Sequence, residues 1–214
     1  MKLTLSTQIP LASGSEKEIY QHFEADKLLI KVWHPQYFKR LKKHHPFLTP
    51  LQRLPKYSAC LKELAEHLYI REWGEELRFV QNIVGIVDTD LGVGLIVEKI
   101  IRKNGDLSQS LHELLTTGRY REVHEKALAE LVNWLRSTGL ILRDLSTRNL
   151  VWDELETRFV IIDGLGGMAR CSFRSLCRWY NKRSNGKRAD KLLSRIERMK
   201  RSQYGVGSLA KQPD

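Results

Sequence analysis

The chain has 214 residues, of which 42% are hydrophobic, and it has 36 Lys and Arg against 25 Asp and Glu. A chain of this length can bury a substantial core. The three cysteines form no CxxC pair, which argues against a disulfide framework or a zinc site. No run approaches the ~20 apolar residues of a membrane-spanning helix, and the start lacks a basic region followed by an apolar stretch. We therefore expect a cytoplasmic protein with one domain or two small lobes.

The positive charge is concentrated near the C-terminal end. Residues 170–202 contain twelve Lys or Arg and two acids, whereas residues 1–169 contain 23 basic and 22 acidic side chains. This distribution favours a local acidic partner over a nucleic-acid binder that uses its whole surface. A solvated basic helix without a partner is the alternative.

The first half is predicted to form a sheet and one helix. Short alternating apolar runs predict a three-stranded meander over 3–11, 19–23 and 27–32, with a break at 12–15. Four prolines predict an irregular connection over 35–55. Apolar residues at helical spacing follow over 57–73. Two β-branched runs, 80–87 and 93–101, predict a hairpin.

The second half is predicted to be mostly helical. Helical spacing covers 107–115 and 120–137, and Gly139 ends the second helix. Short strands over 140–142, 150–152 and 159–162 surround a polar loop, and one or two basic helices follow. We predict an α+β protein with a nucleotide-binding lobe over 1–103 and a reduced, mostly helical lobe over 104–214, which contains the basic helices over 170–202.

The most specific motif lies between these short strands. Residues Leu142 to Leu150 resemble the protein-kinase catalytic loop HRDLxxxN, and Asp163-Gly164-Leu165 resembles the metal-binding DFG turn. Phosphoryl transfer requires an oriented hydroxyl and neutralised phosphate charge. Asp144 would orient the acceptor hydroxyl, and we count the preceding residue, Arg143, among the catalytic residues. Asn149 and Asp163 would hold Mg²⁺ through oxygen atoms. The alternative is that the two aspartates only cap a turn and end a strand.

Two further residues fit this interpretation. Lys31 lies in an apolar strand that resembles the kinase strand with the ATP-binding lysine. A buried lysine needs a counter-ion, and in kinases a glutamate on the next helix provides it. We assign this role to Glu63, with Glu66 as the alternative. Taken alone, Lys31 would be an ordinary edge-strand lysine.

The remaining nucleotide contacts are predicted by position. Gly14 is the one glycine that remains where kinases have GxGxxG, and the backbone N–H groups of Ser13, Gly14 and Ser15 would contact phosphate. A simple turn is the alternative. Glu98 and Ile100 occupy the place of the kinase hinge, where backbone groups would bind adenine.

Over nearly its whole length the chain resembles the YrbL family of PhoP regulatory network proteins. The resemblance lies in Leu11-Ala12-Ser13-Gly14, the strand 28–32, Lys62-Glu63-Leu64 and the basic, Trp- and Cys-containing end. It implies a protein-kinase-like two-lobe fold, with a five-stranded antiparallel sheet and one helix in the first lobe, and ATP and Mg²⁺ as cofactors. We expect an ATP- and Mg²⁺-dependent phosphotransferase that acts on an alcohol group. A pseudokinase that acts as a regulatory binding module in a PhoP-type network is the alternative.

Departures from the kinase pattern bear on the acceptor. Leu142 replaces the kinase His and Leu165 the kinase Phe, which favours the pseudokinase, whereas the retained metal residues disfavour it. No Ala-Pro-Glu motif follows Asp163, so a sugar or lipid headgroup is a candidate acceptor as well as a protein. The basic segment would contact an acidic partner or an anionic membrane surface, which would place the protein at the periphery of the inner membrane. Binding of nucleic acid there is the least favoured use.

Overall fold

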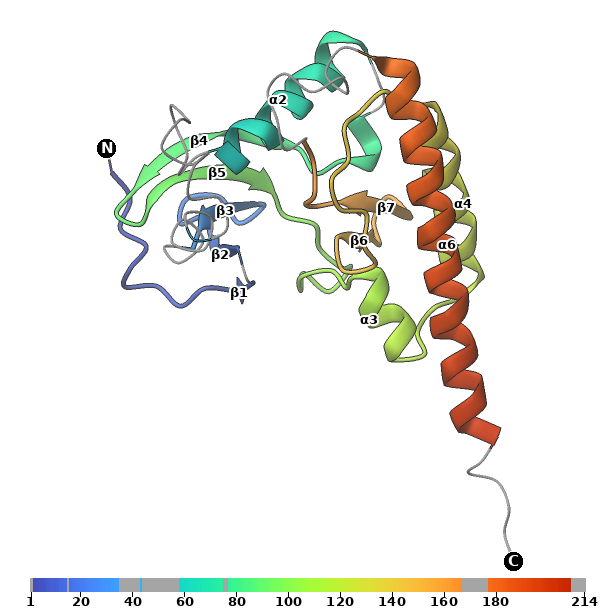
Figure 1. Cartoon of the computed structure of the whole chain (residues 1–214). Coiled ribbons are helices and arrows are strands. Elements are labelled where there is room, and N and C mark those ends of the chain that lie inside the picture. The colour runs from blue at the N-terminus through green and yellow to red at the C-terminus, as the bar shows by residue number, and fades with distance from the viewer. Residues whose placement is uncertain are drawn as a thin grey trace, which may run out of the picture. The chain divides into compact units, whose positions relative to one another are not determined.

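The computed structural model describes residues 2–14, 16–34, 43, 58–74, 77–166 and 177–208. They belong to two compact units (Figure 1). Unit 1 comprises Met1–His67 and Gln81–Lys99, and unit 2 comprises Leu68–Val80 and Ile100–Asp214. Apart from Lys43, the connection predicted over 35–55 lies outside the described residues.

Unit 1 contains a five-stranded antiparallel sheet with the order β1-β2-β3-β5-β4. Its strands are β1 (Ala12–Ser13), β2 (Lys17–Gln21), β3 (Leu28–Trp33), β4 (Ile83–Thr89) and β5 (Gly92–Glu98). Tyr20, Ile30 and Val32 pack with Leu5 in a small apolar cluster on this sheet. The predicted α+β class and the five-stranded antiparallel sheet are therefore confirmed.

The first strand lies elsewhere than predicted. β1 is the two-residue segment Ala12–Ser13, within the stretch that the sequence assigned to a break. Leu3 forms only an isolated parallel bridge to Thr89, and Leu5 is fully buried outside any strand. Of the apolar residues over 3–11, Leu3 and Leu5 thus pack on the sheet without forming a strand, whereas Ile9 and Leu11 are exposed.

The helix predicted over 57–73 is α2 (Ser58–Glu72), which precedes the β4–β5 hairpin in the chain. Its residues up to His67 belong to unit 1 and the rest to unit 2. Gly74, with a φ of 61°, ends the helical segment in the left-handed conformation that glycine adopts at low cost.

Unit 2 is largely helical and also contains a small hairpin. Its elements are the 3-10 helix η2 (Leu77–Phe79), α3 (Leu111–Thr116), α4 (Glu122–Ser137), β6 (Leu150–Asp153), β7 (Arg158–Ile161) and α6 (Arg178–Ser208). Ser110 begins α3 with a capping box, in which its Oγ accepts from the Glu113 N–H and Glu113 Oε2 accepts from the Ser110 N–H. The predicted helix over 107–115 thus begins only at Leu111.

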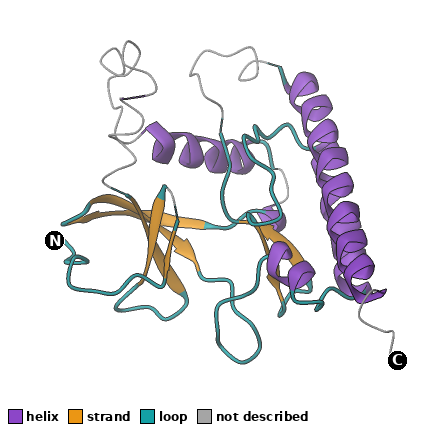
Figure 2. Ribbon diagram, turned by 60° about the horizontal axis from the view of Figure 1, so that its bottom comes forward, coloured by secondary structure: helices purple, strands orange, loops and turns teal. Residues whose placement is uncertain are grey.

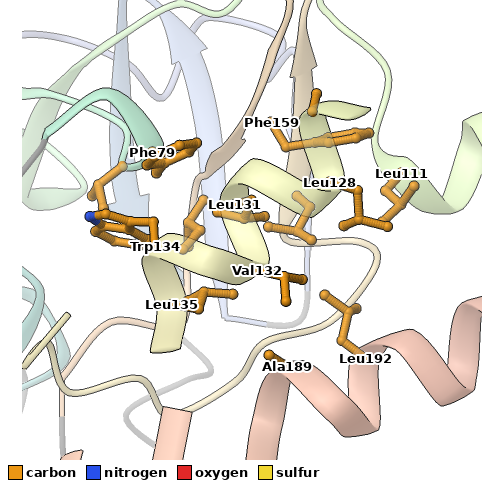
Figure 3. Packing of buried hydrophobic residues seen from close by; sticks show 14 of the residues in the cluster. Phe79, Leu111, Leu128, Leu131, Val132, Trp134, Leu135, Phe159, Ala189 and Leu192 are labelled. Atoms are coloured by element: carbon orange, nitrogen blue, oxygen red, sulfur yellow. The ribbon is translucent and has the colours of Figure 1, made fainter. Parts of the chain in front are cut away.

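The core of unit 2 forms between α4, α6 and the hairpin. Helices α4 and α6 run side by side (Figures 1 and 2). Figure 3 shows Ala189 and Leu192 of α6 beside Val132 and Leu135 of α4. On another side of α4, the rings of Trp134 and Phe79 lie 5.2 Å apart between centroids.

The strand predicted over 140–142 is absent from the structure. Leu142 forms an isolated antiparallel bridge with Leu165, and Leu140 and Ile141 are buried outside any strand. The basic segment forms the single helix α6 over its described part. No helix among the described residues is long and apolar enough to cross a membrane.

Candidate functional site

In unit 2, Asp144 lies in an exposed loop between buried Leu142 and β6. The loop closes on itself, because the Asn149 N–H donates to the Ser146 carbonyl over 3.1 Å. The Asn149 side chain reaches back to Asp144, and its Nδ2 donates to Oδ2 over 3.1 Å and to the main-chain carbonyl over 3.4 Å. The amide nitrogen thus faces Asp144, and the amide oxygen is the atom suited to a cation.

Asp163 follows β7 and lies in a turn that backbone hydrogen bonds attach to the same loop. The Gly164 carbonyl accepts from the Arg143 N–H over 2.7 Å and from the Asp144 N–H over 3.3 Å. The Asn149 carbonyl accepts from the Ile162 N–H over 3.0 Å. The β6–β7 hairpin therefore brings the turn that contains Asp163 next to the loop that contains Asp144 and Asn149.

Gly164 lies close to the backbone of Asp144. Its φ is 84°, and a Cβ at this position would overlap the Asp144 carbonyl oxygen. Its N–H donates to Oδ1 of Asp163 over 2.7 Å, which orients that carboxylate. Both the backbone conformation and the space at this position therefore require glycine.

The chemical character of this group fits a hard divalent cation. Two carboxylates and one amide oxygen on adjacent segments match the oxygen ligands that Mg²⁺ takes, usually together with water and substrate phosphate. Among the described residues, no three His, Cys, Asp or Glu side chains gather into a metal-binding group. A closed protein cage, as in structural zinc sites, is therefore not what the described residues form.

A second group of charged side chains lies in unit 1. Lys31 on β3 and Glu63 on α2 are both buried, and Lys31 Nζ lies 3.2 Å from Glu63 Oε1. Lys17 on β2 is also buried, and its Nζ lies 2.5 Å from Glu63 Oε2. One carboxylate thus bridges two ammonium groups, each on its own oxygen. Glu66, the alternative partner for Lys31, lies one turn further along α2 and is also buried.

The family model described as "PhoP regulatory network protein YrbL" matches residues 3–197. The chain belongs to the YrbL family. The resemblance that the sequence indicated is therefore confirmed. No curated protein matches the chain.

In this YrbL family chain, the sequence did not identify Lys17 as a member of the charged group around Glu63. Lys17 pairs with Trp33, and Ile19 pairs with Lys31, across the antiparallel β2–β3 ladder. Since side chains alternate between faces, this register puts Lys17 and Lys31 on one face of the sheet. The Lys17 ammonium also lies 4.9 Å from the centroid of the Trp33 ring. Only the strand register, which the sequence left open, could have revealed this arrangement.

The predicted phosphate loop is a tight connection between β1 and β2. Ser13 is exposed in β1, and the Gly14 N–H donates to the Lys17 carbonyl over 2.9 Å. Of the three N–H groups that we assigned to phosphate, the one at Gly14 is thus used within the hairpin. Ser15 lies outside the described residues.

The predicted hinge residues fall where the chain passes from one unit to the other. Glu98 ends β5 in unit 1, and Ile100 begins the second segment of unit 2. The Glu98 N–H donates to the Asn82 carbonyl, and the Glu98 carbonyl accepts from Gln81 Nε2 over 2.7 Å. The Ile100 carbonyl accepts from the Ser108 N–H.

Cys60 and His124 are buried side chains whose pKa values are shifted by burial. Burial and the negative charge of Glu63 raise the pKa of Cys60 to about 11, which keeps it a thiol. Cys60 and Cys177 are both free, whereas Cys171 lies outside the described residues. Burial lowers the pKa of His124, whose Nδ1 accepts from the Arg121 N–H. It is a neutral histidine of the core.

Proposed function

We propose that this YrbL family chain is an ATP- and Mg²⁺-dependent phosphotransferase of the protein-kinase-like fold, with an alcohol group as acceptor. The observation that supports it is the joined loop and turn of unit 2. There the Asn149 amide contacts Asp144, and Gly164 links the Asp163 turn to the Asp144 loop. This is the set of groups that phosphoryl transfer requires, namely a carboxylate to orient a hydroxyl and further oxygens to hold a metal.

Each residue has a distinct role in this proposal. Asp144 accepts a hydrogen bond from the acceptor hydroxyl and aligns it, and Arg143 adjoins it in the loop. Asn149 and Asp163 would hold Mg²⁺, which neutralises phosphate charge when bound. Lys31 contacts phosphate, and its ion pair with Glu63 fixes the position of its ammonium group.

The acceptor would be a hydroxyl on a protein, a sugar or a lipid headgroup. The absence of an Ala-Pro-Glu motif after Asp163 separates this chain from kinases that dock peptides in the usual way. We therefore infer that an acceptor fraction should contain sugars and lipids as well as proteins. The family description further suggests a role within a PhoP regulatory network.

A pseudokinase that binds nucleotide as a regulatory module is the second candidate. The observation that favours it is the contact between Leu142 and Leu165, which are both buried and form a bridge. In kinases these two positions are His and Phe. Aliphatic packing here fixes the loop and the turn without the side chains that kinases use for regulation.

Mg²⁺-dependent ATP turnover by the purified chain tests the proposal, with both ADP release and labelled phosphate on acceptors followed. Asp144→Asn and Asp163→Asn should each reduce turnover by at least about 100-fold, because each removes a charge that acts in the transition state. Asp106→Asn in the same unit is the matched control, since its carboxylate is exposed.

The outcomes separate the two candidates. Turnover that is lost in both site variants and kept in the control supports the phosphotransferase. ATP binding without turnover above that of the variants, with all acceptor classes present, favours the pseudokinase. If the parent chain binds no ATP, the assignment of the site is wrong.

A further inference from the structure

The exposed face of α6 is a continuous basic surface. We call it the α6 stripe, and its members are Arg183, Lys187, Lys191, Arg195, Arg198 and Arg201, all of which are exposed. At about 100° of rotation per residue, the six positions fall within an arc of about 120°. At a rise of about 1.5 Å per residue, the stripe is about 27 Å long.

The acidic residues of α6 lie off this stripe and have partners of their own. Asp190 Oδ1 lies 2.8 Å from Arg136 Nη2 on α4. Glu197 Oε1 lies 3.5 Å from Lys200 Nζ, which also contacts Glu125 over 2.7 Å. Within the part of the chain that the structure describes, no member of the stripe forms an ion pair. The stripe therefore keeps its full positive charge toward solvent.

The opposite face of α6 is buried in its own unit. Ala189, Leu192 and Ile196 are almost completely buried in the core shared with α4. The basic arc is therefore the solvent-facing side of a helix whose other side is held by the core. A one-sided surface of this kind can lie flat against an extended anionic plane.

Two aromatic residues at the start of α6 suit the same kind of plane. Trp179 and Tyr180 are both exposed, and by helical rotation Tyr180 lies on the arc of the stripe. Trp and Tyr favour the headgroup region of a bilayer, because their rings are apolar and their N–H or O–H groups are polar. The Arg183 guanidinium lies 6.0 Å from the centroid of the Trp179 ring, so charge and aromatic surface are adjacent.

We propose that the α6 stripe binds the surface of an anionic phospholipid membrane. Attraction between lysine or arginine and anionic headgroups acts within about a Debye length of the surface, and several cations on one side of a helix contribute together. Trp179 and Tyr180 would lie at the headgroup level. The inference concerns a surface outside the proposed phosphotransferase site and does not depend on that activity.

Co-sedimentation of the full chain, without nucleotide, tests the proposal. The vesicles are phosphatidylcholine mixed with phosphatidylglycerol, and phosphatidylcholine alone serves as the neutral surface. We expect binding to the anionic vesicles only. The triple variant Lys187→Gln, Lys191→Gln and Arg195→Gln should bind about 100-fold more weakly, from about fivefold for each cation lost. Glutamine retains helix propensity, so α6 should persist.

Two further variants show that position matters and not charge alone. A second triple variant combines Lys2→Gln, Lys27→Gln and Lys103→Gln and removes three exposed positive charges from other segments. It should reduce binding to anionic vesicles less than fivefold. Lys187→Arg with Lys191→Arg keeps the charge and should bind as the parent does. Raising the salt from about 0.1 M to about 1 M shortens the Debye length from about 10 Å to about 3 Å and should release the parent chain.

Several results would overturn the proposal. One is equal binding by the two triple variants, and another is binding to neutral vesicles that salt does not weaken. A third is that the parent chain fails to bind anionic vesicles. The fourth is that an RNA or DNA oligonucleotide binds through the stripe and prevents vesicle binding at lower concentration than lipid does, which would assign the surface to nucleic acid. Each of these results leaves the proposed phosphotransferase activity untouched, because that activity is tested separately by ATP turnover.

Discussion

Gly164→Ala should destabilise unit 2 because the new methyl group would overlap the Asp144 carbonyl oxygen. Two costs add at this position. A left-handed conformation costs a non-glycine residue about 1–2 kcal/mol, and Gly164 has a φ of 84°. Overpacking in a tight contact typically adds about 1–3 kcal/mol. We therefore expect a total loss of about 2–5 kcal/mol in the free energy of unfolding.

Gly105→Ala is the matched control for this prediction. Gly105 has a φ of 86°, but a Cβ there would meet nothing within 4 Å. Gly105→Ala should therefore lower the free energy of unfolding only by the cost of the left-handed backbone conformation, about 1–2 kcal/mol. Urea unfolding followed by tryptophan fluorescence measures both variants, since Trp134 and Trp152 are buried in unit 2. Equal losses in the two variants would refute the close contact between Gly164 and Asp144.

The same pair of variants also separates stability from activity. The Gly164 carbonyl accepts from the N–H groups of Arg143 and Asp144, so a displaced turn would move the proposed catalytic carboxylate. Under conditions where both variants are folded, Gly164→Ala should lose ATP turnover and Gly105→Ala should retain it. Retained turnover in a destabilised Gly164→Ala would mean that the turn supports the fold and not the reaction.

Two further predictions concern ion pairs. Lys17→Met and Lys31→Met should be coupled in a double-mutant cycle of unfolding free energies by more than about 0.5 kcal/mol, because both ammonium groups contact the Glu63 carboxylate; additive losses would contradict this. The hydrogen bond from Lys200 lowers the pKa of Glu125 below its ordinary value of 4.5. The ionised Glu125 carboxylate therefore stabilises the folded state at pH values above its unfolded pKa, and this stabilisation is lost as pH falls through its folded pKa. Glu125→Gln should therefore lower Tm at neutral pH, with a smaller difference toward about pH 3, whereas a constant difference would count against the ion pair.

The sequence predicted the elements whose pattern is local. The α4 helix buries Leu128, Leu131 and Leu135 at helical spacing, and such periodicity survives in any helical packing. The loop and turn around Asp144 and Asp163 were also found from local motifs. Gly164 lies in that turn because the close approach to Asp144 admits no side chain.

What the sequence could not predict depends on pairing between distant segments. The position of β1 and the place of Lys17 both follow from strand register, which apolar alternation alone does not fix for short, partly polar strands. Leu140 and Ile141 have the composition of a strand, and both are buried, but neither belongs to a strand. Burial and strand formation produce the same apolar signal in a run of three residues.

The basic composition of α6 likewise concealed a structural role of that helix. Asn185 lies within the run of Lys and Arg, yet its side chain is fully buried. Its Nδ2 donates to the Leu140 carbonyl over 2.9 Å and to the Thr138 carbonyl over 3.3 Å. Carbonyls at a helix end need partners from outside the helix, and leaving one buried without a partner costs about 1–3 kcal/mol.

These carbonyls follow α4 and precede the loop that contains Asp144, so Asn185 fixes the backbone at the point where it enters that loop. Positive charge in α6 is thus confined largely to the exposed face and the rim. The buried face, with Asn185 among its apolar residues, belongs to the scaffold of the candidate site. Substitutions in the α6 stripe should therefore affect what the surface binds without moving the Asp144 loop, which is why surface binding and ATP turnover can be tested separately in one chain.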